Sequence, residues 1–350
     1  MLFTTRKRGA LTVMAVVVAT ILASCSSPPP PPPVVLAPPA PPPITLSASV
    51  VERASAFRGY MQRAAAISPS FENGEQIQSS LKVAVAYEPK RFLSGATAYA
   101  AVLALQDPTF VASVRVFAAD PTQRQSVINQ LVADPAYAVG FKGSDTAAGL
   151  IIDTLGNDGL KVYQAGKAVK QAAYSVQHDK WSSLPVLDRD GRLAYAKSMS
   201  ATPGLADSAD VAVLQQASNG AVPLVITPRA VPPPYSPLVI RGMAVAALAA
   251  LGAAGDNNLA TIDAIMVEPT TAMCLNMSKL NLYQCLAVAK PHYEDVFCLG
   301  QHIMIDTGAC MIKASGQALP YEPPPPPKPT PAVTKKKPVA KKASAAKKKS

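Results

Sequence analysis

Apolar residues recur every three or four positions along most of residues 44–320, which is the spacing of one face of an α-helix. One helix is predicted over residues 47–67. A second follows a capping residue, Asn73 or Ser70, and a third covers residues 89–106. The strict alternation that marks a half-buried β-strand is scarce. The pattern therefore predicts a mainly α fold with an Ala-rich helical body, which could be built from stacked short helices.

Three Asp-Pro pairs, Asp107-Pro108, Asp120-Pro121 and Asp134-Pro135, recur 13 and 14 residues apart. Aspartate is a good helix-capping residue, and proline is tolerated in the first turn of a helix. Each pair therefore predicts a helix start. A row of carboxylates that binds cations is the alternative interpretation, and capping is favoured.

The rest of the body also reads as helical, with one interruption. We expect helices over residues 145–156, 159–181 and 190–199, and a Pro-rich irregular connection over 201–235. The strongly apolar residues 238–254 predict a buried central helix. A membrane span is disfavoured there because Arg241 interrupts the segment and much of it is Ala and Gly.

The N-terminus has the three parts of a secretory signal: basic Arg6-Lys7-Arg8, an apolar core, and small residues before Cys25. The tetrapeptide Leu22-Ala23-Ser24-Cys25 resembles the lipobox of bacterial lipoproteins. This resemblance covers only residues 1–25, and the body resembles no family. It implies that residues 1–24 are a signal peptide and that Cys25 becomes the lipidated first residue, carrying diacylglycerol and an acyl chain such as palmitate.

By the same resemblance, Ser26 after Cys25 permits transport to the outer membrane, facing the periplasm, in a two-membrane envelope. An ordinary cleaved signal with an incidental cysteine is the alternative. Residues 25–43 then form a lipidated cysteine and a Pro-rich linker. In polyproline II geometry such a linker reaches on the order of 50 Å, which would lift the body away from the lipid surface.

The formal net charge of +11 resides at the two ends of the chain. Residues 321–350 contain nine lysines and one glutamate, and the signal contains three basic residues, so the remaining residues hold equal numbers of acidic and basic side chains. This Pro/Ala/Lys composition predicts a disordered basic tail. In an exported protein the tail would contact lipopolysaccharide or an anionic cell-wall polymer through its lysine clusters: Lys335, Lys336, Lys337, Lys341, Lys342, Lys347, Lys348 and Lys349. Nucleic acid is disfavoured because no aromatic residue interleaves the lysines.

Four further cysteines, Cys274, Cys285, Cys298 and Cys310, lie within 37 residues. An even number in an exported chain predicts two disulfides, for which three pairings exist. We favour local closure, Cys274 with Cys285 and Cys298 with Cys310, since the two segments look like loose copies of one unit. Pairing across the copies, which would clamp two helices together, is the alternative. Zinc, with His292 and His302 as further ligands, is disfavoured because the spacings fit no short zinc motif.

Familiar catalytic motifs are absent from the sequence, which has no nucleophile elbow, zinc-protease helix or phosphate-binding loop. His178-Asp179 could serve in acid–base chemistry but is also an ordinary surface pair. Asp188-Arg189-Asp190-Gly191 resembles part of a calcium loop, yet the flanking ligand positions are wrong, so a turn capped by aspartate is favoured. We therefore expect no catalytic residues, no metal and no cofactor.

These observations favour a non-enzymatic envelope tether or scaffold, anchored by lipid at one end and contacting anionic polymers at the other. Two alternatives stay open: an envelope hydrolase acting on cell wall or lipid, and a surface protein that binds nucleic acid through its lysines. The helical body is expected in two parts, residues 44–200 and 236–320, on either side of the irregular connection. Whether these parts form one domain or two is left open.

Overall fold

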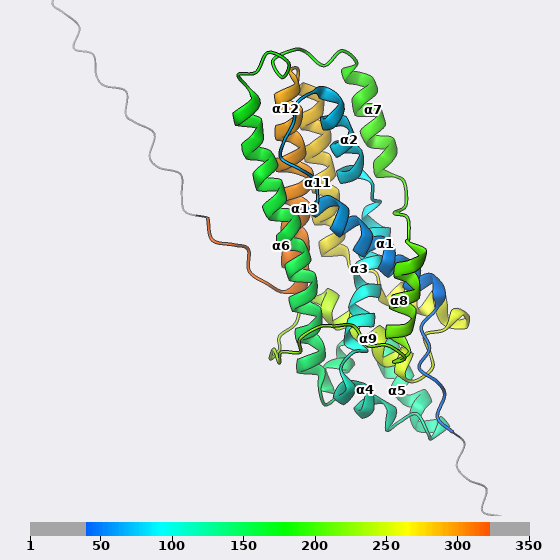
Figure 1. The fold of residues 1–350 in the computed structure, drawn as a ribbon. Helices are drawn as coiled ribbons and strands as arrows, with labels where there is room; N and C mark the ends of the chain where they lie inside the picture. The colour runs from blue at the N-terminus through cyan, green and yellow to red at the C-terminus, as the bar shows by residue number, and fades with distance from the viewer. Residues whose placement is uncertain (1–39, 323–350) are drawn as a thin grey trace, which may run out of the picture. The chain divides into compact units, whose positions relative to one another are not determined.

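Helices make up nearly all regular structure in residues 40–322, the part of the chain that the computed structural model describes (Figure 1). The mainly α prediction is confirmed: residues 40–322 contain isolated β-bridges but no β-strand. The signal peptide, Cys25, most of the Pro-rich linker and all eight clustered lysines lie outside the described residues.

The first seven helices cover the part before residue 201. They are α1 (Ala48–Ala65), α2 (Gly74–Val85), α3 (Pro89–Ala104), α4 (Pro108–Arg115), α5 (Pro121–Ala133), α6 (Ser144–Val176) and α7 (Arg189–Ser200), with a 3-10 helix, η1 (Pro135–Gly140), between α5 and α6.

Six more α-helices follow. They are α8 (Ser208–Ser218), α9 (Pro237–Ala250), α10 (Leu259–Ile265), α11 (Pro269–Val288), α12 (His292–Cys298) and α13 (Asp306–Ser315). A short 3-10 helix, η2 (Asp256–Asn258), precedes α10, and a π-helix, η3 (Leu299–Ile305), joins α12 to α13 without a break.

Side-chain caps begin helices where the sequence predicts them. Asn73, rather than Ser70, caps α2 by accepting from the backbone N–H of Gln76 at 3.0 Å. All three Asp-Pro aspartates cap, with Asp107 accepting from the N–H of Phe110 at 2.7 Å. Asp134 begins the 3-10 helix η1 instead of an α-helix.

Helix α6 is a single helix of 33 residues where the sequence predicts two. The predicted break at residues 157–158 is wrong because the glycines on either side serve packing between helices. A Cβ atom on Gly159 would lie 2.9 Å from the backbone nitrogen of Ile312 in α13, closer than real Cβ contacts come. Gly159 therefore allows α6 and α13 to pack closely together, and it does not end the helix.

Helix α8 corrects the prediction that residues 201–235 are irregular throughout. Asp207 caps it by accepting from the N–H of Asp210, and Leu214 is fully buried. Arg58 of α1 forms an ion pair with Asp210 at 2.7 Å. Because prolines are frequent on both sides of this short helix, the composition of residues 201–235 predicts an irregular segment instead.

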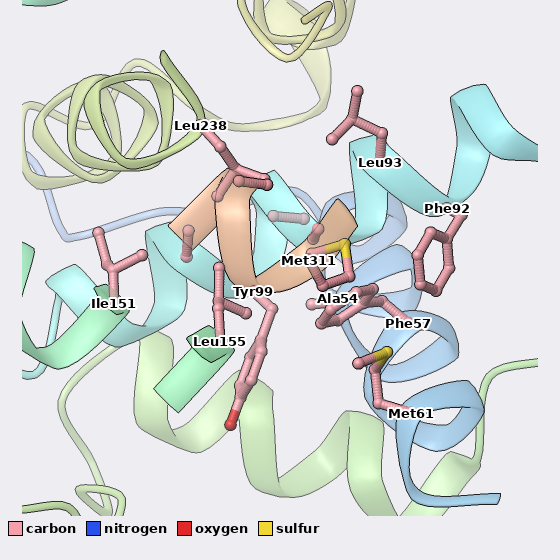
Figure 2. Close-up of a cluster of buried hydrophobic side chains, with 14 of the residues drawn as sticks. Ala54, Phe57, Met61, Phe92, Leu93, Tyr99, Ile151, Leu155, Leu238 and Met311 are labelled. Atoms are coloured by element: carbon pink, nitrogen blue, oxygen red, sulfur yellow. The ribbon is translucent and has the colours of Figure 1, made fainter. Parts of the chain in front are cut away.

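One hydrophobic cluster draws on both predicted parts of the body. Figure 2 shows Phe57 of α1, Leu155 of α6, Leu238 of α9 and Met311 of α13 within this cluster. Helix α9 is buried along nearly its whole length, which confirms the expected central helix. Residues 44–200 and 236–320 therefore share a core. Between residues 40 and 322 no helix is both long and apolar enough to cross a membrane.

Candidate functional site

The four body cysteines form two disulfides, Cys274–Cys310 and Cys285–Cys298. Both join α11 to the continuous helical segment 292–315, so the favoured local pairing is wrong and the pairing across the two copies is correct. Helix geometry explains the outcome. Cys274 and Cys285 are 11 residues apart on one helix, which at 1.5 Å per residue separates them by roughly 16 Å. A disulfide needs Cα atoms within about 7 Å.

A buried ion pair reinforces the same end of the body. Arg192 of α7 pairs with Asp295 of α12, and its guanidinium also donates to the backbone carbonyl of Leu286 in α11. Burial raises the pKa of Asp295 to about 6, although the positive charge of Arg192 acts in the opposite direction. This pair fixes α7 against the helices that the Cys285–Cys298 disulfide connects.

The three histidines have different surroundings. His178 is exposed, and its side chain forms a hydrogen bond with that of Gln177 at 3.3 Å. His292 packs near Trp181, and burial lowers its pKa. His302 lies in the π-helix η3, with its Nδ1 atom 3.4 Å from Asp306.

None of these histidines lines the cavity beside α1 and α11 that is described below. Within residues 40–322, no group of three or more His, Cys, Asp or Glu side chains could hold a metal ion. Asp188 caps α7 by accepting from the N–H of Gly191 at 2.8 Å, so the aspartate-capped turn is confirmed.

A cavity beside α1 and α11, which we call the α1/α11 groove, has a volume of about 1060 Å³. It lies between α1, the start of α3, the loop 203–206, the end of α10 and the first half of α11. Pockets for small molecules measure about 300–1,000 Å³ and are mostly apolar with a few polar groups. The α1/α11 groove matches the upper end of this range and has this kind of lining.

Four aromatic side chains form the floor of the groove: Phe57, Tyr60, Tyr87 and Phe92. Their ring centroids lie 4.7–5.0 Å apart, so the rings support one another in a fixed arrangement. Figure 2 shows Phe57 and Phe92 projecting from α1 and α3. The hydroxyl of Tyr60 donates to the carbonyl of Ala84 at 2.8 Å, and burial raises the pKa of this phenol. The rings of the floor are therefore closely packed, and the buried Tyr60 hydroxyl has a hydrogen-bond partner.

The walls of the groove carry large apolar side chains that face solvent. Leu205 is 79% exposed, Val267 63%, Met273 68% and Met277 48%. Met273 and Met277 are four residues apart on α11, and residues at this spacing share a face of a helix. Methionine adapts its shape to a ligand at low cost. A gathering of exposed apolar groups around a cavity is typical of a binding site.

A buried lysine lies behind the floor. The ammonium of Lys279 sits 3.8 Å from the centre of the Tyr87 ring and donates to the carbonyl of Val85 at 2.8 Å. Lys279 is only 4% exposed, and no carboxylate pairs with it within residues 40–322. Burial lowers the pKa of Lys279 to about 7, with a weaker opposing effect from Glu88.

Sequence reasoning did not find the α1/α11 groove or Lys279. The groove combines residues from five segments far apart in the chain, and each segment alone reads as ordinary helix or loop. The four-residue spacing of Met273 and Met277 is the one signal in the sequence that could have indicated a shared apolar face on a helix. Lys279 looks like any helix-surface lysine in the sequence.

Comparisons of the chain with models of protein families, with curated proteins and with solved structures found no match.

Proposed function

We propose that this protein is a lipid-anchored tether of the bacterial cell envelope, exported through its signal and attached to a membrane at Cys25. The lysines near the other end contact an anionic envelope polymer, such as lipopolysaccharide or a wall polymer. The proposed role is non-enzymatic, and the helical body acts as a spacer and scaffold between the two attachments. In a two-membrane envelope we place the anchor on the outer membrane, facing the periplasm.

The observation that carries the proposal is where the two ends of the described chain attach to the body. Near the N-terminus, Thr45 donates its N–H to the carbonyl of Ala249 in α9, and Arg115 of α4 donates to the carbonyl of Pro42. At the other end, Glu322 contacts Tyr163 and forms an ion pair with Lys167 at 2.9 Å, both on α6. The two ends thus leave from different helices of one body (Figure 1), an arrangement that suits a bridge.

The two disulfides support export. Disulfides persist in oxidising compartments such as the bacterial periplasm and are rare in the cytosol. The pairings Cys274–Cys310 and Cys285–Cys298 tie α11 to the segment 292–315, so an envelope location would stabilise the body directly.

The test is retention of the purified full-length protein on immobilised lipopolysaccharide and on isolated wall polymer over a range of salt concentrations. A variant with all eight clustered lysines changed to glutamine should elute at much lower salt, because the phosphates lose their cationic partners. A matched variant with the same lysines changed to arginine should elute like the original protein. If the glutamine variant elutes at the same salt as the original, the tethering role of the lysines is refuted.

The same measurement separates the tether from the nucleic-acid alternative. Immobilised duplex DNA replaces the envelope polymer in a parallel column. We expect retention on lipopolysaccharide or wall polymer to persist at higher salt than retention on DNA. The reverse order would favour surface binding of nucleic acid.

A further inference from the structure

The α1/α11 groove combines an apolar interior with an unequal distribution of charge around its rim. Seven charged residues line it: Glu52, Arg53, Glu88, Lys90, Arg91, Asp263 and Glu268. A ligand would interact most directly with those rim charges that have no partner within the body.

Four of the seven charges are engaged. Arg53 and Asp263 form an ion pair with each other across α1 and α10. Glu88 caps α3 by accepting from the N–H groups of Lys90 and Arg91 at 3.1 and 2.8 Å. Glu268 caps α11 by accepting from two backbone N–H groups at 2.7–2.8 Å and is itself buried.

Three charged side chains remain: Glu52, Lys90 and Arg91. All three are exposed, and none takes part in an ion pair or a side-chain hydrogen bond within residues 40–322. Lys90 and Arg91 are neighbours on the first turn of α3, so two positive charges stand together at the mouth. The nearby negative charges are the Glu88 carboxylate, which caps this helix, and Glu52 on α1. Arginine and lysine side chains are the usual partners of phosphate oxygens.

The interior of the groove indicates what the apolar part of the ligand is. The floor of buried aromatic rings and the walls formed by Met273, Met277 and Leu205 are apolar, and only a few uncharged polar side chains, such as Ser49, Ser94 and Asn276, lie among them. Such a surface suits acyl chains, because each methylene removed from water contributes about 0.8 kcal/mol. The volume of about 1060 Å³ is large enough for an amphiphile of lipid size.

We propose that the α1/α11 groove binds a phospholipid, with its acyl chains against Phe57, Met273 and Met277 and its phosphate at Lys90 and Arg91. The assignment depends on the groove alone and holds whether or not Cys25 carries a lipid. Bound in this way, a phospholipid would shield the four exposed apolar side chains of the walls and give Lys90 and Arg91 an anionic partner.

The test is isothermal titration of the full-length protein with dihexanoyl-phosphatidylglycerol below its critical micelle concentration. Inorganic phosphate and hexanoate serve as the head and chain alone. We expect saturable binding of the phospholipid, and binding at least tenfold weaker for each fragment. Hexanoate that binds as tightly as the phospholipid would overturn the assignment of phosphate to the rim.

Two pairs of variants separate the chain site from the head site. Met273→Glu with Met277→Glu should weaken phospholipid binding by more than tenfold, and Lys90→Glu with Arg91→Glu by about tenfold. The controls are Leu187→Glu, which changes an exposed apolar residue outside the groove, and Lys180→Glu, which reverses an exposed charge elsewhere. Since all these side chains are exposed, the variants should fold.

The proposal is overturned if the phospholipid does not bind, or if it binds the methionine variant as tightly as the original protein. A synthetic amphipathic helix of leucine and lysine provides a further arm. If this peptide binds the groove and the phospholipid does not, the groove is a protein-docking site and the lipid assignment is wrong.

Discussion

Replacing Lys279 by methionine should make the protein more stable at neutral pH and remove part of its pH dependence. The lysine is buried, and its ammonium has lost most of its contact with water. A pKa of about 7, against 10.5 for an ordinary lysine, corresponds to a cost of about 5 kcal/mol for keeping the charged form in the folded state. Methionine has a similar length and no charge.

Two contacts of Lys279 reduce the expected gain. Its hydrogen bond to Val85 is worth about 1 kcal/mol, and that carbonyl also accepts from the N–H of Tyr87 at 2.7 Å, so it stays satisfied in the variant. The contact of the ammonium with the Tyr87 ring is worth about 2 kcal/mol when desolvated. The net expectation is that Lys279→Met is more stable than the original protein by about 2 kcal/mol at pH 7.

The sign of the pH dependence follows from proton binding. Between pH 7 and 10.5 the unfolded chain keeps the proton on Lys279 while the folded chain releases it, so the original protein gains stability as the pH rises. The original protein gains about 4 kcal/mol between pH 7 and pH 10.5, so the stability advantage of Lys279→Met should shrink and then reverse, to about 2 kcal/mol in favour of the original protein near pH 10.5.

The assay is urea unfolding of the full-length protein, followed by circular dichroism at pH 7, 8, 9 and 10. Lys82→Met, which removes an exposed lysine from α2, is the matched control and should show a small difference that does not depend on pH. If the difference between Lys279→Met and the original protein is constant over this range, the lysine keeps its proton in the fold and the reasoning is refuted.

Two further predictions concern how α11 and α6 pack against the segment 292–315. Replacing both Cys285 and Cys298 by serine should lower the free energy of unfolding by about 3 kcal/mol, from the chain-entropy value for a loop of this size. Urea unfolding checks it, and a non-reducing digest that links two peptides of α11 to each other would contradict the pairing. In Gly308→Ala the new Cβ would lie 2.6 Å from the backbone nitrogen of Tyr163, so we expect a loss of about 1–3 kcal/mol from overpacking. Gly140→Ala, where nothing lies within 4 Å, should change stability by less than about 0.5 kcal/mol; equal losses in both variants would refute the close-packing account.

Local signals in the sequence were sufficient for the helices and their starts. An aspartate followed by proline caps a helix through its own neighbouring backbone, so Asp107 and Asp120 could be interpreted without tertiary information. The same holds for the buried helix α9, because a long apolar segment is stable only where it is removed from water. These features depend on contacts within a few residues of the signal.

Features set by contacts between distant segments could not be read in the same way. Gly156 and Gly159 look like a helix break until α13 is known to lie against them. The disulfides depend on which helix faces which, since α11 cannot close on itself. The α1/α11 groove and the buried Lys279 exist only when α1, α3 and α11 have come together, so no pattern along the chain predicted either of them.

The proposed membrane anchor at Cys25 is tested most directly by the mass of the N-terminal peptide of the mature protein. The protein is purified from bacterial membranes, digested and analysed by mass spectrometry beside a Cys25→Ala variant. We expect that the first residue is Cys25, that its mass includes a diacylglycerol and an amide-linked acyl chain, and that Cys25→Ala leaves the membrane fraction. An unmodified Cys25, or a Cys25→Ala variant that stays with the membrane to the same extent, would contradict it.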